Sequence, residues 1–113
     1  MKRSIQFYGP RILDFLNTLD QHTIEKIEWT IALIKNHDRI PNNYFKHLTG
    51  TNGLYEIRCE WLGNAIRLFC FFDEGKMIII VHGFKKKTQK TPLKEIHQAL
   101  KIKNEYYEEK KSK

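Results

Sequence analysis

Three closely spaced runs of aromatic and β-branched residues constrain this chain more than any other feature. The runs cover Leu54–Leu62, Ala65–Asp73 and Lys76–Gly83, and two residues separate each run from the next, Gly63-Asn64 and Glu74-Gly75. Two-residue connections that contain glycine or asparagine typically join neighbouring antiparallel strands. The sequence therefore predicts a three-stranded antiparallel meander.

A strand and amphipathic helices are predicted on either side of the meander. Lys2–Tyr8 alternates in polarity like a half-buried strand, Asn36–Gly53 is rich in turn residues and is predicted as a loop, and Thr91-Pro92 is typical of a helix start. Apolar residues at helical spacing predict a helical hairpin and a final helix, namely Ile12, Leu13, Leu16 and Leu19, then Ile24, Ile27, Ile31 and Ile34, then Leu93, Ile96, Leu100 and Tyr107. The predicted fold class is α+β, with one domain over residues 1–113.

Composition is that of a soluble globular protein. The chain has 113 residues, of which 41% are hydrophobic and 29% are charged. No apolar stretch approaches the roughly 20 residues that span a bilayer, and Lys2 and Arg3 are not followed by the apolar run of a signal peptide. We therefore expect a cytoplasmic protein without a membrane segment. Cys59 and Cys70 have no metal-ligand spacing and are predicted to lie in the core.

Positive charge is concentrated in the last quarter of the chain. The net charge is +7, and residues 83–113 contain ten Lys and four Glu, so that segment carries +6 of the total. A basic patch of this kind favours nucleic acid as the partner, and an acidic protein as the second choice. The alternative is a solvated lysine-rich tail.

Register counted from the two predicted turns places four polar side chains on one face of the meander. Glu60 and His82 are expected opposite Arg67, with Arg58 as a diagonal neighbour. The other face is apolar and is the one that the helices should cover. It comprises Ile57, Cys59, Trp61, Ile66, Leu68, Cys70, Met77, Ile79 and Val81.

The polar face is predicted to bind phosphate. Arginine can donate two parallel hydrogen bonds to phosphate oxygens, and Lys85, Lys86 and Lys87 follow the last strand with further positive charge. Two alternatives stay open. The arginines can form plain ion pairs, Arg67 with Glu60 and Arg58 with Glu56, and His82 can be a packed residue instead of an acid or base.

Other catalytic chemistries find little support in the sequence. The remaining histidines have no partners at metal-ligand spacing, the aspartates do not form the set of a divalent-metal nuclease, and no Ser or Cys has an activating context. We therefore expect no metal, no cofactor and no small-molecule substrate. The two tryptophans, Trp29 and Trp61, are interpreted as core or edge packing.

The stretch from Gly53 to Pro92 resembles the phage-derived branch of RelE/HigB-like toxins. A G-x-Y-E-x-R strand, an arginine followed by aromatics, an apolar strand and a G-F-x-K-K-T-Q-K-T-P string occur in the family's order, here at Gly53–Arg58, Arg67–Phe72, Met77–Val81 and Gly83–Pro92. The resemblance implies the toxin of a type II toxin–antitoxin pair, with a helix-turn-helix antitoxin as partner. It also implies a metal-independent endoribonuclease that cleaves mRNA on the ribosome, with helices on one sheet face and a concave basic face opposite.

The resemblance also implies roles for individual residues. Arg67 would bind the scissile phosphate and Arg58 would support it from the neighbouring strand. The RelE branch places another basic residue where Glu56 stands, so the proton-transfer roles stay open between His82 and the lysines. The candidate residues are, for catalysis, Arg67, Lys86, Lys87 and His82, and, for RNA or phosphate binding, Arg58, Lys85, Lys90 and Phe84.

A second functional class competes with the enzyme. The same basic face would serve a non-catalytic RNA- or ribosome-binding module in which Phe69, Phe71 or Phe84 stack on bases. A third reading is a small interaction protein with an acidic partner, which is compatible with a toxin covered by its antitoxin.

Overall fold

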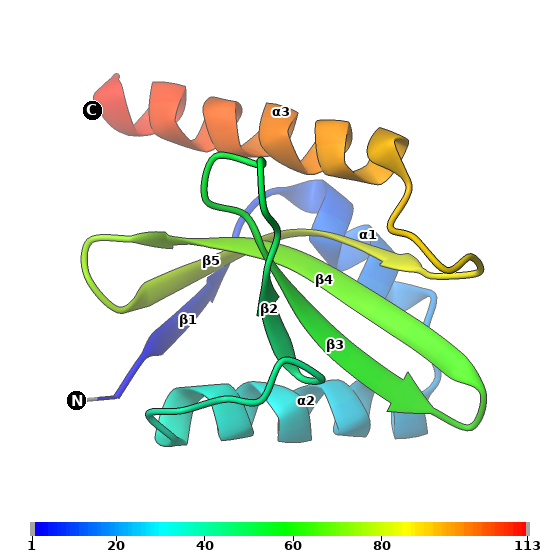
Figure 1. The fold of residues 1–113 in the computed structure, drawn as a ribbon. Coiled ribbons are helices and arrows are strands. Elements are labelled where there is room, and N and C mark those ends of the chain that lie inside the picture. The colour runs from blue at the N-terminus through cyan, green and yellow to red at the C-terminus, as the bar shows by residue number, and fades with distance from the viewer. Residues whose placement is uncertain (1, 113) are drawn as a thin grey trace.

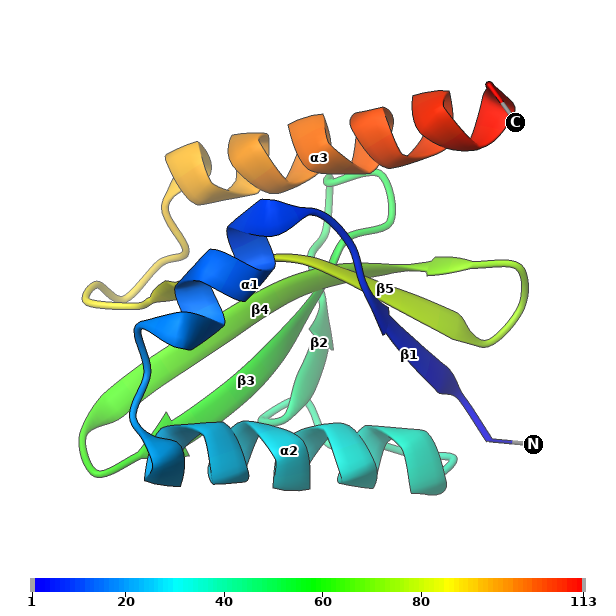
Figure 2. The same cartoon turned by 180° about the vertical axis from the view of Figure 1, so that it is seen from behind.

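A five-stranded mixed sheet with helices on both faces forms the centre of the protein (Figures 1 and 2). The structure is a computed structural model that describes residues 2–112. Its elements are β1 (Ser4–Phe7), α1 (Pro10–Asn17), α2 (Gln21–Asn36), β2 (Phe45–His47), β3 (Tyr55–Trp61), β4 (Asn64–Asp73), β5 (Met77–Lys85) and α3 (Leu93–Lys111). The strand order is β1-β5-β4-β3-β2, with β1 parallel to β5 and the other neighbours antiparallel. The predicted α+β class and order of elements are confirmed, and β2 is an additional strand inside the predicted loop.

Local sequence signals explain where the helices begin. Pro10 opens α1, where its missing N–H costs no helical hydrogen bond. The Asp20 side chain caps α2 by accepting a hydrogen bond from the Thr23 backbone N–H at 2.8 Å, and this bond lowers the pKa of Asp20. The predicted cap of α3 is wrong, because Pro92 holds that position and the Thr91 side chain makes a different contact.

The first hairpin differs in register from the prediction. Its turn residues are Leu62 and Gly63, both with positive φ (47° and 79°), as a tight two-residue hairpin turn requires. Arg58 therefore lies directly opposite Arg67, and Glu60 lies opposite Ala65. The sequence predicts the turn at Gly63-Asn64, one residue too late, because Gly-Asn is as plausible a turn pair as Leu-Gly.

The second hairpin contains an irregularity that sequence alone did not reveal. Its loop has three residues, and further along Phe69 lies opposite His82 whereas Cys70 lies opposite Ile80. One extra residue of β5 is thus left without a partner, as in a β-bulge. The bulge brings His82 to the face of Arg67, as predicted, but opposite Phe69 instead of Arg67.

Both faces of the sheet are buried, which corrects the expectation of one helix-covered face. The hairpin of α1 and α2 covers a cluster that includes Ile12, Ile27, Ile34, Ile57, Cys59, Ile66, Leu68, Cys70, Ile78 and Ile80. On the opposite face α3 covers Leu54, Phe69, Phe71, Ile79, Val81, Phe84, Ala99 and Ile102 (Figure 1). Met77, Ile79 and Val81 therefore pack on the α3 side, not on the side predicted for them.

Cysteine burial agrees with the sequence prediction. Cys59 and Cys70 are free thiols in the core, and burial raises the pKa of both. Within residues 2–112 no helix has the length and apolar character needed to cross a membrane.

Candidate functional site

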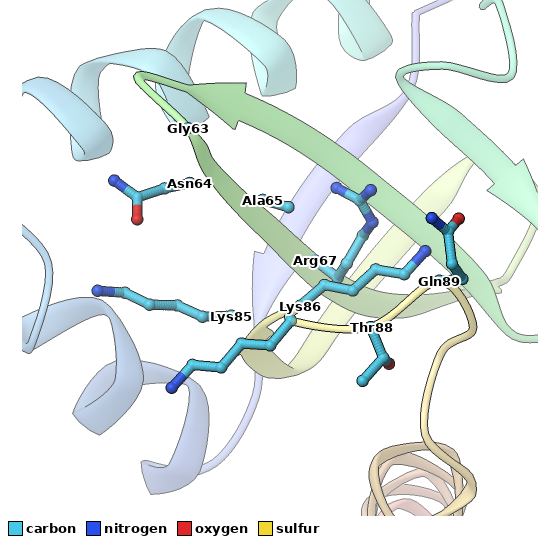
Figure 3. A pocket seen from close by; sticks show the side chains of 9 residues that line it. Gly63, Asn64, Ala65, Arg67, Lys85, Lys86, Thr88 and Gln89 are labelled. Carbon is cyan, nitrogen blue, oxygen red and sulfur yellow. The ribbon is translucent and has the colours of Figure 1, made fainter.

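A basic pocket of about 660 Å³ lies between the β3–β4 turn and the chain that leaves β5 (Figure 3). It is lined by Gly63, Asn64, Ala65, Arg67, Lys85, Lys86, Lys87, Thr88 and Gln89. Asn64 and Lys85 lie toward one end of the pocket, and Arg67 and Gln89 lie toward the other (Figure 3). The structure therefore brings four of the predicted site residues together.

Arg67 is buried at the inner wall of this pocket, with only 4% of its surface exposed. One terminal nitrogen donates to Glu60 Oε1 at 2.8 Å, and the other donates to the Ile66 carbonyl at 3.1 Å. The Ile66 carbonyl therefore holds the arginine from the protein side. On the outer side the arginine is covered by the Glu60 side chain, which is 63% exposed. The predicted ion pair between Arg67 and Glu60 is present.

Glu56 is the buried centre behind the two arginines. Its side chain is only 2% exposed, and its Oε1 lies 3.3 Å from Arg58 Nε and 3.6 Å from Arg67 Nε. Its Oε2 accepts a hydrogen bond from Thr91 Oγ1 at 2.8 Å. Neither arginine Nε has a hydrogen-bond partner among residues 2–112, so the attraction to Glu56 is electrostatic rather than a well-aligned hydrogen bond.

The Glu56–Thr91 contact ties the lysine-rich segment to the sheet. From the sequence, Thr91 is predicted as a helix cap, and Glu56 as an ion-pair partner of Arg58 at a position where the RelE branch has a basic residue. The alternation of β3 indicated that Glu56 and Arg58 share a face, but a contact with Thr91 joins positions 35 residues apart and carries no local sequence signal.

Lysines supply the net charge of the pocket. The two arginines and the two glutamates in contact with them cancel, and Lys85 and Lys87 are exposed while Lys86 is half-buried. A cavity with mobile ammonium groups and a fixed guanidinium has the charge and the donors to hold a phosphate.

His82 lies outside the pocket. Its Nε2 is 2.8 Å from Glu95 Oε1 on α3, and its ring stacks on Phe69 with centroids 6.1 Å apart. The alternative of a packed, partnered histidine is therefore the one that the structure favours. His82 and Glu95 join β5 to the first turn of α3.

The predicted aromatic platforms are also absent from the pocket surface. Phe69, Phe71 and Phe84 are all buried, and Phe84 stacks on Phe69 with centroids 5.4 Å apart. Phe84, which is predicted to contact RNA, packs in the cluster that α3 covers. Their alternating positions did not show which face α3 would take.

Two further predicted residues lie near the pocket without lining it. Lys90 is exposed, and its carbonyl accepts a hydrogen bond from Thr88 Oγ1 at 2.7 Å. Arg58 lines a different, smaller pocket on the far side of Glu60. Within the described part of the chain, no group of three His, Cys, Asp or Glu side chains is arranged to hold a metal ion.

Comparison with known proteins places the chain in a family. A search of curated proteins found no match. Residues 14–104, which include both hairpins and the basic pocket, match the family described as phage-derived protein Gp49-like (DUF891). The chain therefore belongs to the phage-derived Gp49-like family, a family of RelE-like toxins.

Proposed function

We propose that this protein is the toxin of a type II toxin–antitoxin pair and acts as a metal-independent endoribonuclease on mRNA, on the ribosome and in the cytoplasm. A helix-turn-helix antitoxin would be its inhibitory partner. The observation that supports the proposal most strongly is the position of Arg67, buried at the wall of a lysine-lined pocket in a member of a RelE-like toxin family.

The proposed reaction needs only groups of the RNA, of this pocket and of Glu60 beside it. The ribose 2′-OH attacks the adjacent phosphorus, the bond to the 5′ oxygen of the next nucleotide breaks, and a 2′,3′-cyclic phosphate remains. Negative charge grows on the non-bridging oxygens, where a fixed guanidinium stabilises it. Arg67 supplies that group once the phosphate displaces the exposed carboxylate of Glu60 from its terminal nitrogen.

Proton transfer is assigned to residues that line the pocket or contact Arg67. Lys86 and Lys87 carry the proton for the leaving 5′ oxygen, and Lys85 contributes charge. Glu60, released from Arg67, is the carboxylate available to accept the proton of the 2′-OH. His82 is not assigned a role, because its imidazole is paired with Glu95.

The experiment is a short induced pulse of the protein in growing bacteria, followed by mapping of mRNA 5′ ends against reading frames. Wild type and Arg39→Ala, which removes an exposed arginine outside the site, should both produce new ends confined to translated regions. Arg67→Ala should abolish them, and Arg67→Lys, which keeps the charge but loses the fork, should reduce them strongly.

Outcomes separate the enzyme from a binding module. Ends that persist in Arg67→Ala, or that are absent with folded wild-type protein, would refute the proposed enzyme. Ribosome binding without cleavage would leave the non-catalytic RNA-binding module as the better description. The burial of Phe69, Phe71 and Phe84 argues against that module in its predicted form, because no stacking platform is left among those three.

A further inference from the structure

A second pocket of about 330 Å³ lies across Glu60 from the basic pocket. It is lined by Lys26, Asn43, Tyr44, Arg58 and Glu60. It forms at the outer edge of the sheet, because β2 pairs only with Tyr55–Ile57 while β3 continues to Trp61. From the sequence, Arg58 and Glu60 are expected on the polar face of the meander, whereas Asn43 and Tyr44 are expected only in a loop.

An aromatic pair, the exposed Trp29 and the half-buried Tyr44, borders this second pocket. Trp29 on α2 is 50% exposed, and its ring meets Tyr44 edge to face with centroids 5.7 Å apart. Lys26 Nζ lies 4.2 Å from the Trp29 ring centroid. Trp29 therefore packs at the edge of the fold, one of the two positions expected from the sequence, and its exposed half offers an aromatic surface of the kind on which bases stack.

Positive charge faces the aromatic pair. Arg58 is held from behind by Glu56 at 3.3 Å and donates a long 3.3 Å hydrogen bond to the Asn42 carbonyl. Its Nε is buried and has no hydrogen-bond partner among residues 2–112. Glu56 and Glu60 balance the charges of Lys26 and Arg58, so the pocket suits phosphate through its donors, the ammonium of Lys26 and the guanidinium of Arg58, rather than through net charge.

We propose that this second pocket binds the nucleotide of single-stranded RNA that adjoins the scissile phosphate. The base stacks on Tyr44 beside Trp29, and Arg58 and Lys26 hold the phosphate of that nucleotide. Glu60 lines this pocket and contacts Arg67, which lines the other, so a chain of two nucleotides crosses from one pocket to the other over Glu60. The position next to the scissile bond rests on the proposed function, whereas the binding of a stacked nucleotide does not.

Trp29 provides a direct signal for binding. The test uses Trp61→Phe protein, so that Trp29 is its single tryptophan, and a 2′-O-methyl RNA hexamer that lacks the attacking hydroxyl. Trp29 emission should change saturably as the hexamer is added. In the same background Tyr44→Ala should weaken binding roughly 5- to 150-fold, the range for loss of one stacked base, and Tyr44→Phe should bind like the parent.

A hexamer of the same charge with abasic sites is the matched control probe. Its affinity should be insensitive to Tyr44→Ala, whereas Lys26→Gln should weaken both probes because it removes a phosphate contact. Equal losses with both probes in Tyr44→Ala, or no loss with either, would overturn the proposal. If Tyr44→Ala fails to fold, full affinity in folded Lys26→Gln protein would overturn it as well.

The two proposals can fail separately. A saturable, Tyr44-dependent Trp29 signal in a protein that does not cleave RNA would keep the nucleotide site and remove the nuclease. Cleavage that depends on Arg67, with no change in Trp29 emission and no effect of Tyr44→Ala, would keep the nuclease and remove the nucleotide site.

Discussion

Two buried acids on the same face of the sheet have opposite surroundings. Asp73, at the end of β4, accepts from Tyr106 at 2.6 Å and from Lys110 at 2.8 Å, and both donors come from α3. Glu56, within β3, is surrounded by Arg58, Arg67 and Thr91. The comparison shows one acid enclosed by the helix and one whose cationic partners border open pockets.

The hydrogen bonds of Asp73 join α3 to the end of β4. Burial raises the pKa of Asp73, but hydrogen bonds from Lys110 and Tyr106 outweigh this effect and leave the pKa lowered. Burial together with the Asp73 bond raises the pKa of Tyr106 to about 12. The donors of this cluster are used within the protein and hold the end of α3 on the sheet.

The Glu56 cluster instead leaves donors directed outward. Arg67 gives one terminal nitrogen to the exposed carboxylate of Glu60, which a phosphate can replace, and both arginine Nε atoms face Glu56 without a hydrogen bond. An arrangement that fixes cations from behind and leaves their outer donors exchangeable is typical of a binding site. The difference separates a stabilising acid from one that positions a site.

The largest expected loss of stability is that of Glu56→Gln. Removing this charge breaks the ion pair with Arg58 and leaves the almost fully buried Arg67 paired with the exposed Glu60, and breaking a buried pair in this way costs about 3–5 kcal/mol. Urea unfolding monitored by circular dichroism measures the change, with Glu28→Gln as an exposed control on α2. A loss no larger than that of the control would mean that Glu56 does not hold the arginines.

Gly83→Ala tests the packing of α1 on the face of β5 opposite to both acids. A Cβ at Gly83 would lie 2.5 Å from Phe15 Cδ2 and 2.9 Å from Leu68 Cδ2, so overpacking should cost about 1–3 kcal/mol. Phe15→Leu should recover part of this loss in the double variant, measured by a double-mutant cycle in urea. Simple additivity of the two substitutions would contradict a direct clash.

The two hairpins show why sequence predicted the elements better than their register. Alternation and turn residues defined the strands, and Arg58, Arg67 and His82 do share a face. A choice between neighbouring turn pairs moved the first register, and the bulge near His82 changed which apolar residues of β5 meet α3. Such features depend on packing across the sheet, which local patterns do not encode.

The site residues divide in the same way: contacts across one hairpin could be predicted from the sequence, and contacts between distant elements could not. The run Lys85–Lys87 and Arg67 meet in one pocket because they are adjacent across one hairpin, which sequence could predict. The contacts of Thr91 with Glu56 and of His82 with Glu95 depend on where α3 lies, and the meeting of Tyr44 with Trp29 depends on the path of a predicted loop. None of these long-range contacts leaves a periodic signal.

Asp73→Asn should cost about 1.5 kcal/mol at neutral pH, because the charge-assisted bonds from Tyr106 and Lys110 are weakened. The folded-state pKa of Asp73 is lowered, so its contribution is full above the ordinary carboxyl value of 3.8 and is lost as the pH falls below it. Thermal unfolding from pH 7 to pH 3 should show the gap between variant and wild type closing. A gap that is constant over this range would show that the Asp73 charge is not the cause, and Asp14→Asn on α1 controls for an exposed carboxyl.

Thr91→Val is the smallest change in this series. It tests whether the bond between Thr91 and Glu56 positions the lysine-rich segment for catalysis or only stabilises the fold. Valine keeps the shape of threonine but cannot donate to Glu56 Oε2, so the unfolding free energy should fall by about 1 kcal/mol. Cleavage should fall by more than this loss explains, because the lysine-bearing segment is then no longer tied to the carboxylate behind Arg67. The measurement pairs urea unfolding with RNA cleavage at saturating RNA.

Thr88→Val is the matched control for that substitution. Its hydroxyl donates to the Lys90 carbonyl at 2.7 Å within the same segment, so its removal should change the segment without removing the bond to Glu56. If Glu56 positions the site through Thr91, cleavage at saturating RNA falls further in Thr91→Val than in Thr88→Val, which changes the pocket lining but leaves the Glu56–Thr91 bond in place. Equal effects would mean that the segment acts as a flexible source of charge, and the contrast between an acid that stabilises and an acid that positions would then rest on the arginines alone.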